Sequence, residues 1–122
     1  MKEKLTFLVG VYFSLVSCSN SVTADFEITN GTGMRIDSLK IEPMVISNGN
    51  YISLDSNEKA KYIADMTDIP KHDGSYGISY QINEENKIKD FGYYTNGYPL
   101  EKITKIEIQG ETILIDQIFS SY

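Results

Sequence analysis

The chain of 122 residues is short of several residue types, and each shortage narrows what it can do. Its single cysteine, Cys18, excludes a disulfide within the chain, so packing alone must hold the fold. Its single histidine, His72, means that a zinc site would have to rely on carboxylates. Tryptophan, the side chain that stacks best on sugars, is absent, whereas nine tyrosines are present. A protein partner is therefore favoured over a glycan.

The sequence also lacks a hydrophobic run long enough to cross a membrane. Its longest apolar run, from Leu5 to Val16, has about a dozen residues, and a spanning helix needs about 20. Lys2 and Lys4 precede the run. This arrangement is typical of the apolar region of a secretory signal peptide.

Four adjacent residues end this segment, Leu15-Val16-Ser17-Cys18. They resemble the lipobox of bacterial lipoproteins, in which Leu, a small or β-branched residue and a small residue precede the cysteine. The resemblance implies that residues 1–17 are a signal peptide, that the thiol of Cys18 carries diacylglycerol, and that the new amine is acylated. Two or three acyl chains anchor a protein stably. The alternatives are an ordinary signal peptide with a chance cysteine and a cysteine buried in a core helix.

The small format and the composition rich in Ile, Asn and Tyr resemble the envelope lipoproteins of Bacteroidetes. Ser19 stands where lipoproteins retained in the enterobacterial inner membrane carry Asp, which favours the outer membrane. The acidic run that often directs Bacteroidetes lipoproteins to the surface does not follow Ser19. The resemblance therefore implies the periplasmic face of the outer membrane rather than the cell surface.

Removal of residues 1–17 takes away Lys2, Lys4 and Glu3, which changes the formal net charge from −6 to −7. An acidic surface argues against nucleic-acid binding and against electrostatic docking on anionic lipid. The remaining length suits one domain. We expect a lipidated tether over 18–24 and a single β domain over 25–122.

Short runs rich in Ile and Tyr, separated by Gly and Asn, predict strands and turns in the mature chain. A phase slip in the apolar pattern predicts a bulge near Asp37-Ser38. Residues 55–61 could form a helical turn instead of part of a strand. Gln109-Gly110-Glu111 predicts the turn of a hairpin. Strands are expected over 25–29, 34–42, 51–54, 60–66, 75–82, 87–94 and on both sides of that last turn, and further turns over 30–33, 47–50, 69–74 and 83–86.

Seven or eight short strands with frequent turns predict an all-β fold. The first choice is a single antiparallel two-sheet β-sandwich of the immunoglobulin-like class, without its usual Cys pair or Trp. A small β-barrel is the alternative.

No catalytic or metal-binding set can be assembled from the sequence, and we expect no cofactor. His72 and Asp73 are adjacent in a probable turn, but a triad would also need a nucleophile and an oxyanion site. Glu84 and Glu85 indicate a charged hairpin tip. The central acidic residues lack the calcium-loop spacing and are expected to form a solvated face. They are Asp55, Glu58, Asp65, Asp68 and Asp73.

Residues 91–99, FGYYTNGYP, are the strongest candidate for recognition. Tyr93 and Tyr94 would point to opposite faces of a strand, one into the core and one into solvent. Tyrosine offers a large, stiff contact area with a polar tip. We expect a contact patch of Tyr94, Asn96 and Tyr98, with ordinary core packing as the alternative.

Asp37-Ser38-Leu39 resembles the short O-glycosylation motif of exported Bacteroidetes proteins, which implies that Ser38 can be modified.

The leading interpretation is a lipid-anchored envelope protein that binds a protein partner and catalyses no reaction; a glycan partner is possible. The alternatives are a structural subunit of an outer-membrane assembly, a periplasmic immunity protein, and a small glycan-directed enzyme that uses Asp73 or Glu84.

Overall fold

The structure is a computed structural model, and it describes residues 21–44 and 51–120. These residues form strands, turns and loops and contain no helix. The strands are β1 (Thr23–Asn30), β2 (Ile36–Glu42), β3 (Ile52–Leu54), β4 (Lys59–Asp65), β5 (Gly74–Ile82), β6 (Glu85–Thr95), β7 (Tyr98–Pro99), β8 (Ile103–Ile108) and β9 (Ile113–Ile118).

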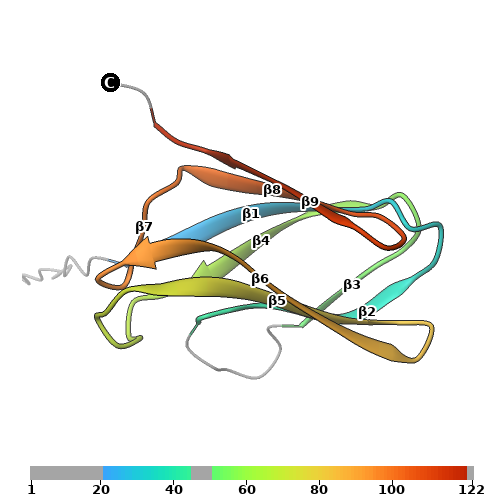
Figure 1. Ribbon diagram of the computed structural model, residues 1–122, viewed down its shortest axis with the longest axis horizontal. Coiled ribbons are helices and arrows are strands. Elements are labelled where there is room, and N and C mark those ends of the chain that lie inside the picture. Colours follow the sequence, from blue (N-terminus) through green and yellow to red (C-terminus); the bar gives the residue numbers. More distant parts are fainter. Residues whose placement is uncertain (1–20, 45–50, 121–122) are drawn as a thin grey trace, which may run out of the picture.

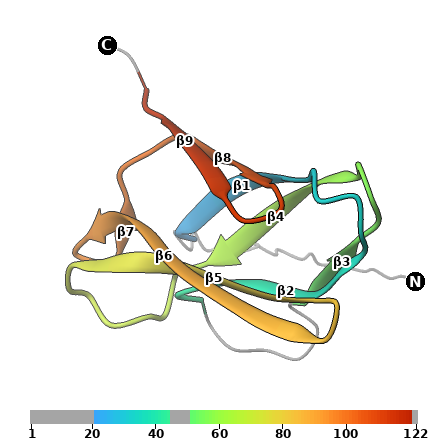
Figure 2. The same ribbon diagram turned by 45° about the vertical axis from the view of Figure 1, so that its right-hand side comes forward.

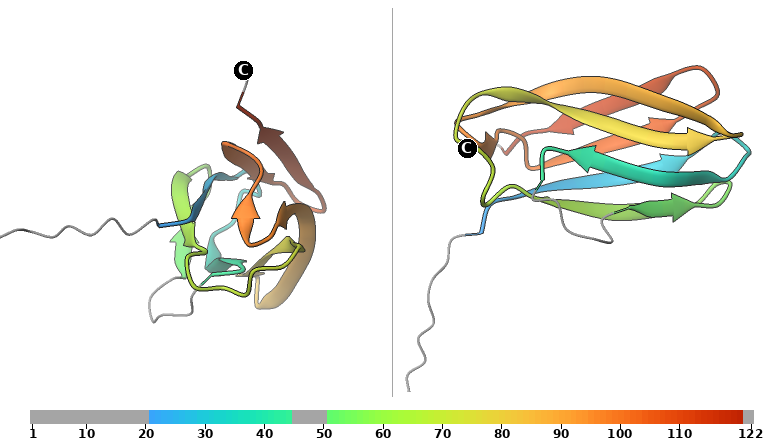
Figure 3. Two further views of the ribbon diagram at one scale, coloured as in Figure 1. Left: turned by 90° about the vertical axis from the view of Figure 1, so that its left-hand side faces the viewer. Right: turned by 90° about the horizontal axis from the view of Figure 1, so that it is seen from below.

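The strands form two sheets that pack face to face (Figure 1). One has the order β4-β1-β8-β9, and the other has the order β3-β2-β5-β6-β7. The predicted all-β, two-sheet sandwich is therefore confirmed. Seen along the strands, the sheets curl around a common interior (Figure 3).

The connectivity differs from the prediction in two respects. β1 pairs with β8 in parallel, so the sandwich is not wholly antiparallel. An immunoglobulin domain keeps its first two strands in one sheet, whereas here β1 and β2 lie in different sheets. Sequence periodicity reports which face of a strand is buried and carries no information on which strand lies beside it.

Alternating side chains of the two sheets form the core. Ala24, Phe26 and Ile28 of β1 and Tyr76 of β5 are almost completely buried. Phe26 meets Tyr76 edge to face, with ring centroids 5.4 Å apart, and Phe91 at 6.1 Å. Such pairs add about 0.5–1.5 kcal/mol each beyond the burial of their area.

The predicted bulge in β2 is confirmed. The pairing register shifts between Asp37 and Lys40, and Ser38 has a φ of 53°. This shift brings Leu39 back to the interior, so that Ile36 and Leu39 are both fully buried. An alternating strand could not bury residues three apart on one face.

Most other predicted elements also appear. Residues 55–58 form a turn that leads directly into β4, and the helical alternative for 55–61 is wrong. Ile106 and Ile108 pair with Ile115 and Ile113 as expected. The turn predicted for 47–50, the signal peptide and Cys18 lie outside the described residues.

The sandwich has two ends, which are named here the distal end and the tether end (Figure 1). The distal end comprises residues 31–35, 55–58, 83–84 and 109–112, where β1 and β8 end. The tether end comprises Val22, residues 66–73, residues 95–102 and Phe119, and β1 begins there. β1 starts at Thr23, so residues 23 and 24 belong to the sheet and the β domain begins before the predicted boundary at 25.

Candidate interaction surface

The three residues of the predicted contact patch differ in burial, because Tyr94 is buried whereas Asn96 and Tyr98 are exposed. Tyr94 is only 5% exposed, and its ring packs on Tyr76 with centroids 5.5 Å apart. Tyr94 therefore belongs to the core and cannot present its ring to a partner. Tyr93 is 59% exposed and Tyr98 is 50% exposed. The expectation that Tyr93 and Tyr94 point to opposite faces is confirmed, and the exposed aromatic pair is Tyr93 and Tyr98.

The turn between β6 and β7 holds Tyr98 in place. Asn96 and Gly97 have φ values of 52° and 77°, the conformation that favours Asn-Gly in a two-residue hairpin. The backbone N–H of Asn96 donates to Asp73 Oδ1 at 2.9 Å, and the N–H of Gly97 donates to the carbonyl of His72 at 3.0 Å. The turn is thus fixed to residues 66–73.

Gly97 also lies close to the side chain of Lys71. A Cβ at Gly97 would lie 2.8 Å from Cδ of Lys71. The Lys71 ammonium lies 5.4 Å from the centroid of the Tyr98 ring and donates to the carbonyl of Thr67 at 2.9 Å. The ammonium of Lys71 therefore lies beside the exposed ring of Tyr98, within the range of a cation–π interaction.

Residues 66–73 are tied in turn to the start of the domain. The N–H of Met66 donates to the carbonyl of Val22 at 2.8 Å, and the N–H of Val22 donates to Thr67 Oγ1 at 3.0 Å. Met66 is fully buried, and Ile69 is 8% exposed. Hydrogen bonds therefore link the end of the tether to the Tyr98 turn through a single packed loop (Figure 3, left).

A buried acid lies just inside the tether end. Glu101 is 7% exposed, and the hydroxyl of Tyr76 donates to its Oε2 at 2.7 Å. Burial and the neighbouring carboxylate raise the pKa of Tyr76 well above its usual value. Sequence reasoning missed Glu101, because it precedes β8 by two residues and no pattern distinguishes it from an exposed loop acid.

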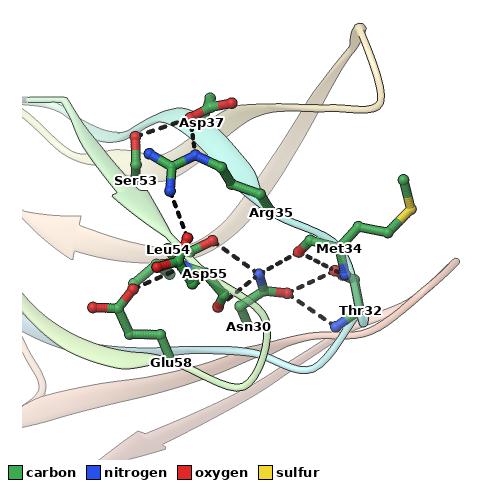
Figure 4. A network of polar contacts seen from close by, with 9 residues as sticks. All are labelled: Asn30, Thr32, Met34, Arg35, Asp37, Ser53, Leu54, Asp55 and Glu58. Carbon is green, nitrogen blue, oxygen red and sulfur yellow. Dashed lines mark hydrogen bonds and ion pairs between the residues drawn. The ribbon is translucent and has the colours of Figure 1, made fainter.

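The distal end contains a buried polar network around Asn30, which is fully buried (Figure 4). Its Nδ2 donates to the carbonyls of Met34, Leu54 and Asp55 at 2.6, 3.1 and 3.1 Å. Its Oδ1 accepts from the N–H and the hydroxyl of Thr32 at 2.9 and 2.7 Å. One amide thereby joins the β1–β2 loop to the end of β3, a structural role.

Arg35 forms exposed ion pairs beside this network. Its Nε donates to Asp37 Oδ1 at 3.0 Å, and its guanidinium also pairs with Asp55. These carboxylates raise the pKa of Arg35. Ser53 and Glu58 complete the network through Asp37 and the N–H of Asp55.

A second candidate surface lies between the sheets in the distal half of the molecule. In the described part of the chain, β6 pairs with β7 only at Tyr94 and Thr95, and β9 pairs with β8 alone. A hollow of about 330 Å³ lies between these two edges and is lined by Tyr80, Lys87, Lys89 and Ile113 among others. Figure 2 shows β6 and β9 on this side of the sandwich. Lys87 and Lys89 are the strand partners of Tyr80 and Ile78, whose side chains face the interior. The two lysine side chains therefore lie on the inner face of this edge strand, and such inward-pointing charges discourage edge-to-edge pairing.

The structure does not gather the predicted acidic residues in one place. Asp55 and Glu58 lie at the distal end, whereas Asp65, Asp68 and Asp73 lie at or beside the tether end. Within residues 21–44 and 51–120, no group of three or more His, Cys, Asp or Glu side chains could hold a metal.

The two carboxylates considered for catalysis occupy turns at opposite ends. Asp73 fixes the Asn96 turn, and Nδ1 of the adjacent His72 lies 3.0 Å from the carbonyl of Asp73. Glu84 lies with Asn83 in the β5–β6 turn, both at positive φ. Asp73 therefore has a local structural role, and Glu84 occupies the opposite end of the sandwich.

Ser38 is exposed at the β2 bulge. Its hydroxyl therefore meets a geometric requirement for modification, although it lies within a strand.

Comparison with known proteins gives no family model that matches the chain, and neither the search of curated proteins nor that of solved structures gives a significant match. Among the described residues, no helix is long and apolar enough to cross a membrane.

Proposed function

We propose that this protein is a lipid-anchored protein of the bacterial envelope that binds a protein partner and catalyses no reaction. The lipobox residues Leu15 to Cys18 support the anchor. The proposed location is the outer membrane, on its periplasmic face.

The observation that carries the binding role is the exposure of large apolar side chains on a domain with a well-packed interior. Ile88 of β6 and Leu114 of β9 are 77% and 49% exposed, while Phe26, Tyr76 and other core side chains are almost fully buried. Ile88 also lines the hollow between the β6 and β9 edges. Exposed apolar side chains beside an open strand edge favour a surface that binds another protein. Unpaired strand edges on β6 and β9 add a second means of recognition.

The absence of tryptophan favours a protein over a glycan, and the acidic net charge of −6 argues against nucleic acid. Ser38 is a proposed site of O-glycosylation, which an intact mass equal to lipid plus polypeptide would exclude.

The anchor is tested by the intact mass of the full chain extracted from bacterial membranes. We expect a chain that begins at Cys18 and carries diacylglycerol and an acyl group. In the Cys18→Ser variant, the expected product is an unlipidated chain that leaves the detergent phase. A wild-type chain cut elsewhere or without lipid would contradict the proposal.

The binding role is tested by photo-crosslinking in living cells, with a photoreactive residue at Ile88 of β6 in one strain and at Leu114 of β9 in another. We expect one position to give a single adduct of defined mass that is lost when neighbouring exposed residues are substituted. Absence of an adduct from both positions would contradict the protein-partner proposal. A constant stoichiometric complex would identify a structural subunit.

A further inference from the structure

The tether end carries a group of exposed apolar side chains from separate parts of the chain. Tyr93, Tyr98, Leu100 and Phe119 are 59%, 50%, 47% and 56% exposed. Tyr93 and Tyr98 flank the β6–β7 turn, Leu100 follows β7, and Phe119 follows β9. β9 is antiparallel to β8, and β8 is parallel to β1, so the end of β9 lies where β1 begins. The topology therefore brings these four residues to one end of the molecule (Figure 1).

The length of the tether fixes which end lies nearest to the membrane. Four residue steps separate Cys18 from Val22, and a fully extended chain covers at most about 14 Å over that distance. β6, with 11 residues, runs about 36 Å from one end to the other. If Cys18 carries the anchor, the tether end stays within about 14 Å of the bilayer, whereas the distal turns can stand about 36 Å farther away.

Hydrogen bonds connect Val22 to the Tyr98 turn. Val22 is hydrogen-bonded to Met66 and Thr67, and the same loop holds Asn96 and Gly97 through Asp73 and His72. Val22 and the Tyr98 turn are therefore held at the same end of the domain.

The chemistry of the four side chains suits the boundary between lipid headgroups and acyl chains. Tyrosine has an apolar ring and a polar tip, and it is enriched at membrane interfaces. Lys71, beside the Tyr98 ring, can keep its ammonium among the headgroups. Asp68 and Asp73 face solvent at the same end as Lys71 and Lys102, and the buried Glu101 leaves this end with a formal charge of −1.

We infer that the tether end rests on the bilayer that holds the Cys18 anchor, with Tyr93, Tyr98, Leu100 and Phe119 at the headgroup boundary. This inference rests on the proposed lipidation of Cys18. The domain then stands with its distal end and the open edges of β6 and β9 away from the membrane, where a partner can reach them. Because the contact is apolar, it does not require anionic lipid.

The test uses the full lipidated protein in vesicles of phosphatidylcholine alone. Cys18 is the chain's only cysteine and would be occupied by lipid, so Thr95→Cys or Glu111→Cys introduces a unique thiol for a spin label. We expect the label at position 95 to collide several-fold more with oxygen, relative to a water-soluble nickel chelate, than the label at 111. Adding phosphatidylglycerol or salt should leave this ratio unchanged.

A triple substitution, Tyr93→Ser with Tyr98→Ser and Phe119→Ser, should bring the label at 95 to the ratio found at 111 while the mass of the lipidated chain shows the anchor intact. Met34→Ser, which removes an exposed apolar side chain at the distal end, is the control and should leave the ratio at position 95 unchanged. Unchanged urea midpoints show that the variants fold.

The outcomes separate the two proposals. A lipidated protein with both labels in water, or with both at the same depth, overturns the membrane contact and leaves the anchor standing. A chain without lipid on Cys18 overturns both.

Discussion

The distal end is organised around one buried polar side chain, Asn30, whereas the tether end exposes several large apolar side chains. At the distal end, the Asn30 side chain makes five hydrogen bonds while fully buried. At the tether end, the loop of residues 66–73 is hydrogen-bonded both to Val22 and to the Tyr98 turn. Four large apolar side chains are exposed at the same end. A network of buried hydrogen bonds specifies one conformation of its loops. Exposed apolar side chains contribute little to folding and are available for contact. The comparison indicates that the buried amide of Asn30 stabilises the distal loops, whereas the apolar side chains of the tether end remain exposed.

Substitution of Asn30 should have the largest effect on this contrast. Asn30→Ala removes the side-chain donor to the carbonyls of Met34, Leu54 and Asp55, of which those of Met34 and Asp55 also accept from Thr32 Oγ1 and the N–H of Glu58. Buried unsatisfied groups cost about 1–3 kcal/mol each. Because water can reach some of them, we expect the free energy of unfolding to fall by about 3 kcal/mol, measured by urea denaturation. Thr32→Ala, which removes one hydroxyl from the rim of the network, should cost less than half as much. Equal losses in the two variants would show that Asn30 is not the centre of the network.

The Tyr76–Glu101 pair should make the free energy of unfolding depend on pH in the alkaline range. Burial and Glu101 raise the pKa of Tyr76 above its ordinary value of 10.0. The folded protein therefore keeps a proton that the unfolded chain releases, and the free energy of unfolding falls as the pH rises above about 10. Each such group contributes a slope of at most about 1.4 kcal/mol per pH unit.

Tyr76→Phe should make this alkaline slope shallower without abolishing it, because burial also raises the pKa of Tyr62 and Tyr80. Tyr93→Phe, at an exposed position, is the control and should keep the wild-type slope. If the Tyr76 variant loses stability with pH as steeply as the wild type, the proposed linkage is wrong.

Asp73 should have a smaller effect, confined to the tether end. Asp73→Ala removes the acceptor for the N–H of Asn96 and should lower the free energy of unfolding by about 1 kcal/mol. Hydrogen exchange should be faster at Asn96 and Gly97 than in the wild type, while the amides around Asn30 keep their protection. Faster exchange at both ends would mean that the two ends are not independent.

Arg35 should have the smallest effect, although it makes two ion pairs. Its side chain is 56% exposed, and exposed ion pairs are screened by salt and contribute little. Arg35→Ala should leave the urea midpoint at 0.15 M salt unchanged within error. A clear fall would show that the ion pairs around the Asn30 network support its geometry.

The sequence could predict much of the fold, because burial periodicity is local. The alternation of Tyr76, Ile78 and Tyr80 identified β5, and the slip between Ile36 and Leu39 identified the bulge in β2. The opposite orientation of Tyr93 and Tyr94 also followed from strand geometry. The pattern could not say which of the two tyrosines is buried, because both rings are equally suited to a core.

The sequence by itself determined an all-β chain with its strands, its turns and a motif for anchoring, because these depend on neighbouring residues. Only the tertiary structure decided that Tyr94 is buried, that Glu101 meets Tyr76, and that Asn30 joins the distal loops. Only the strand order brought Phe119 to the same end as Tyr98 and the start of β1. The physical reason is that burial, hydrogen-bond partners and shared surfaces arise between residues that are far apart in the chain, and the parallel pairing of β1 with β8 sets those distances.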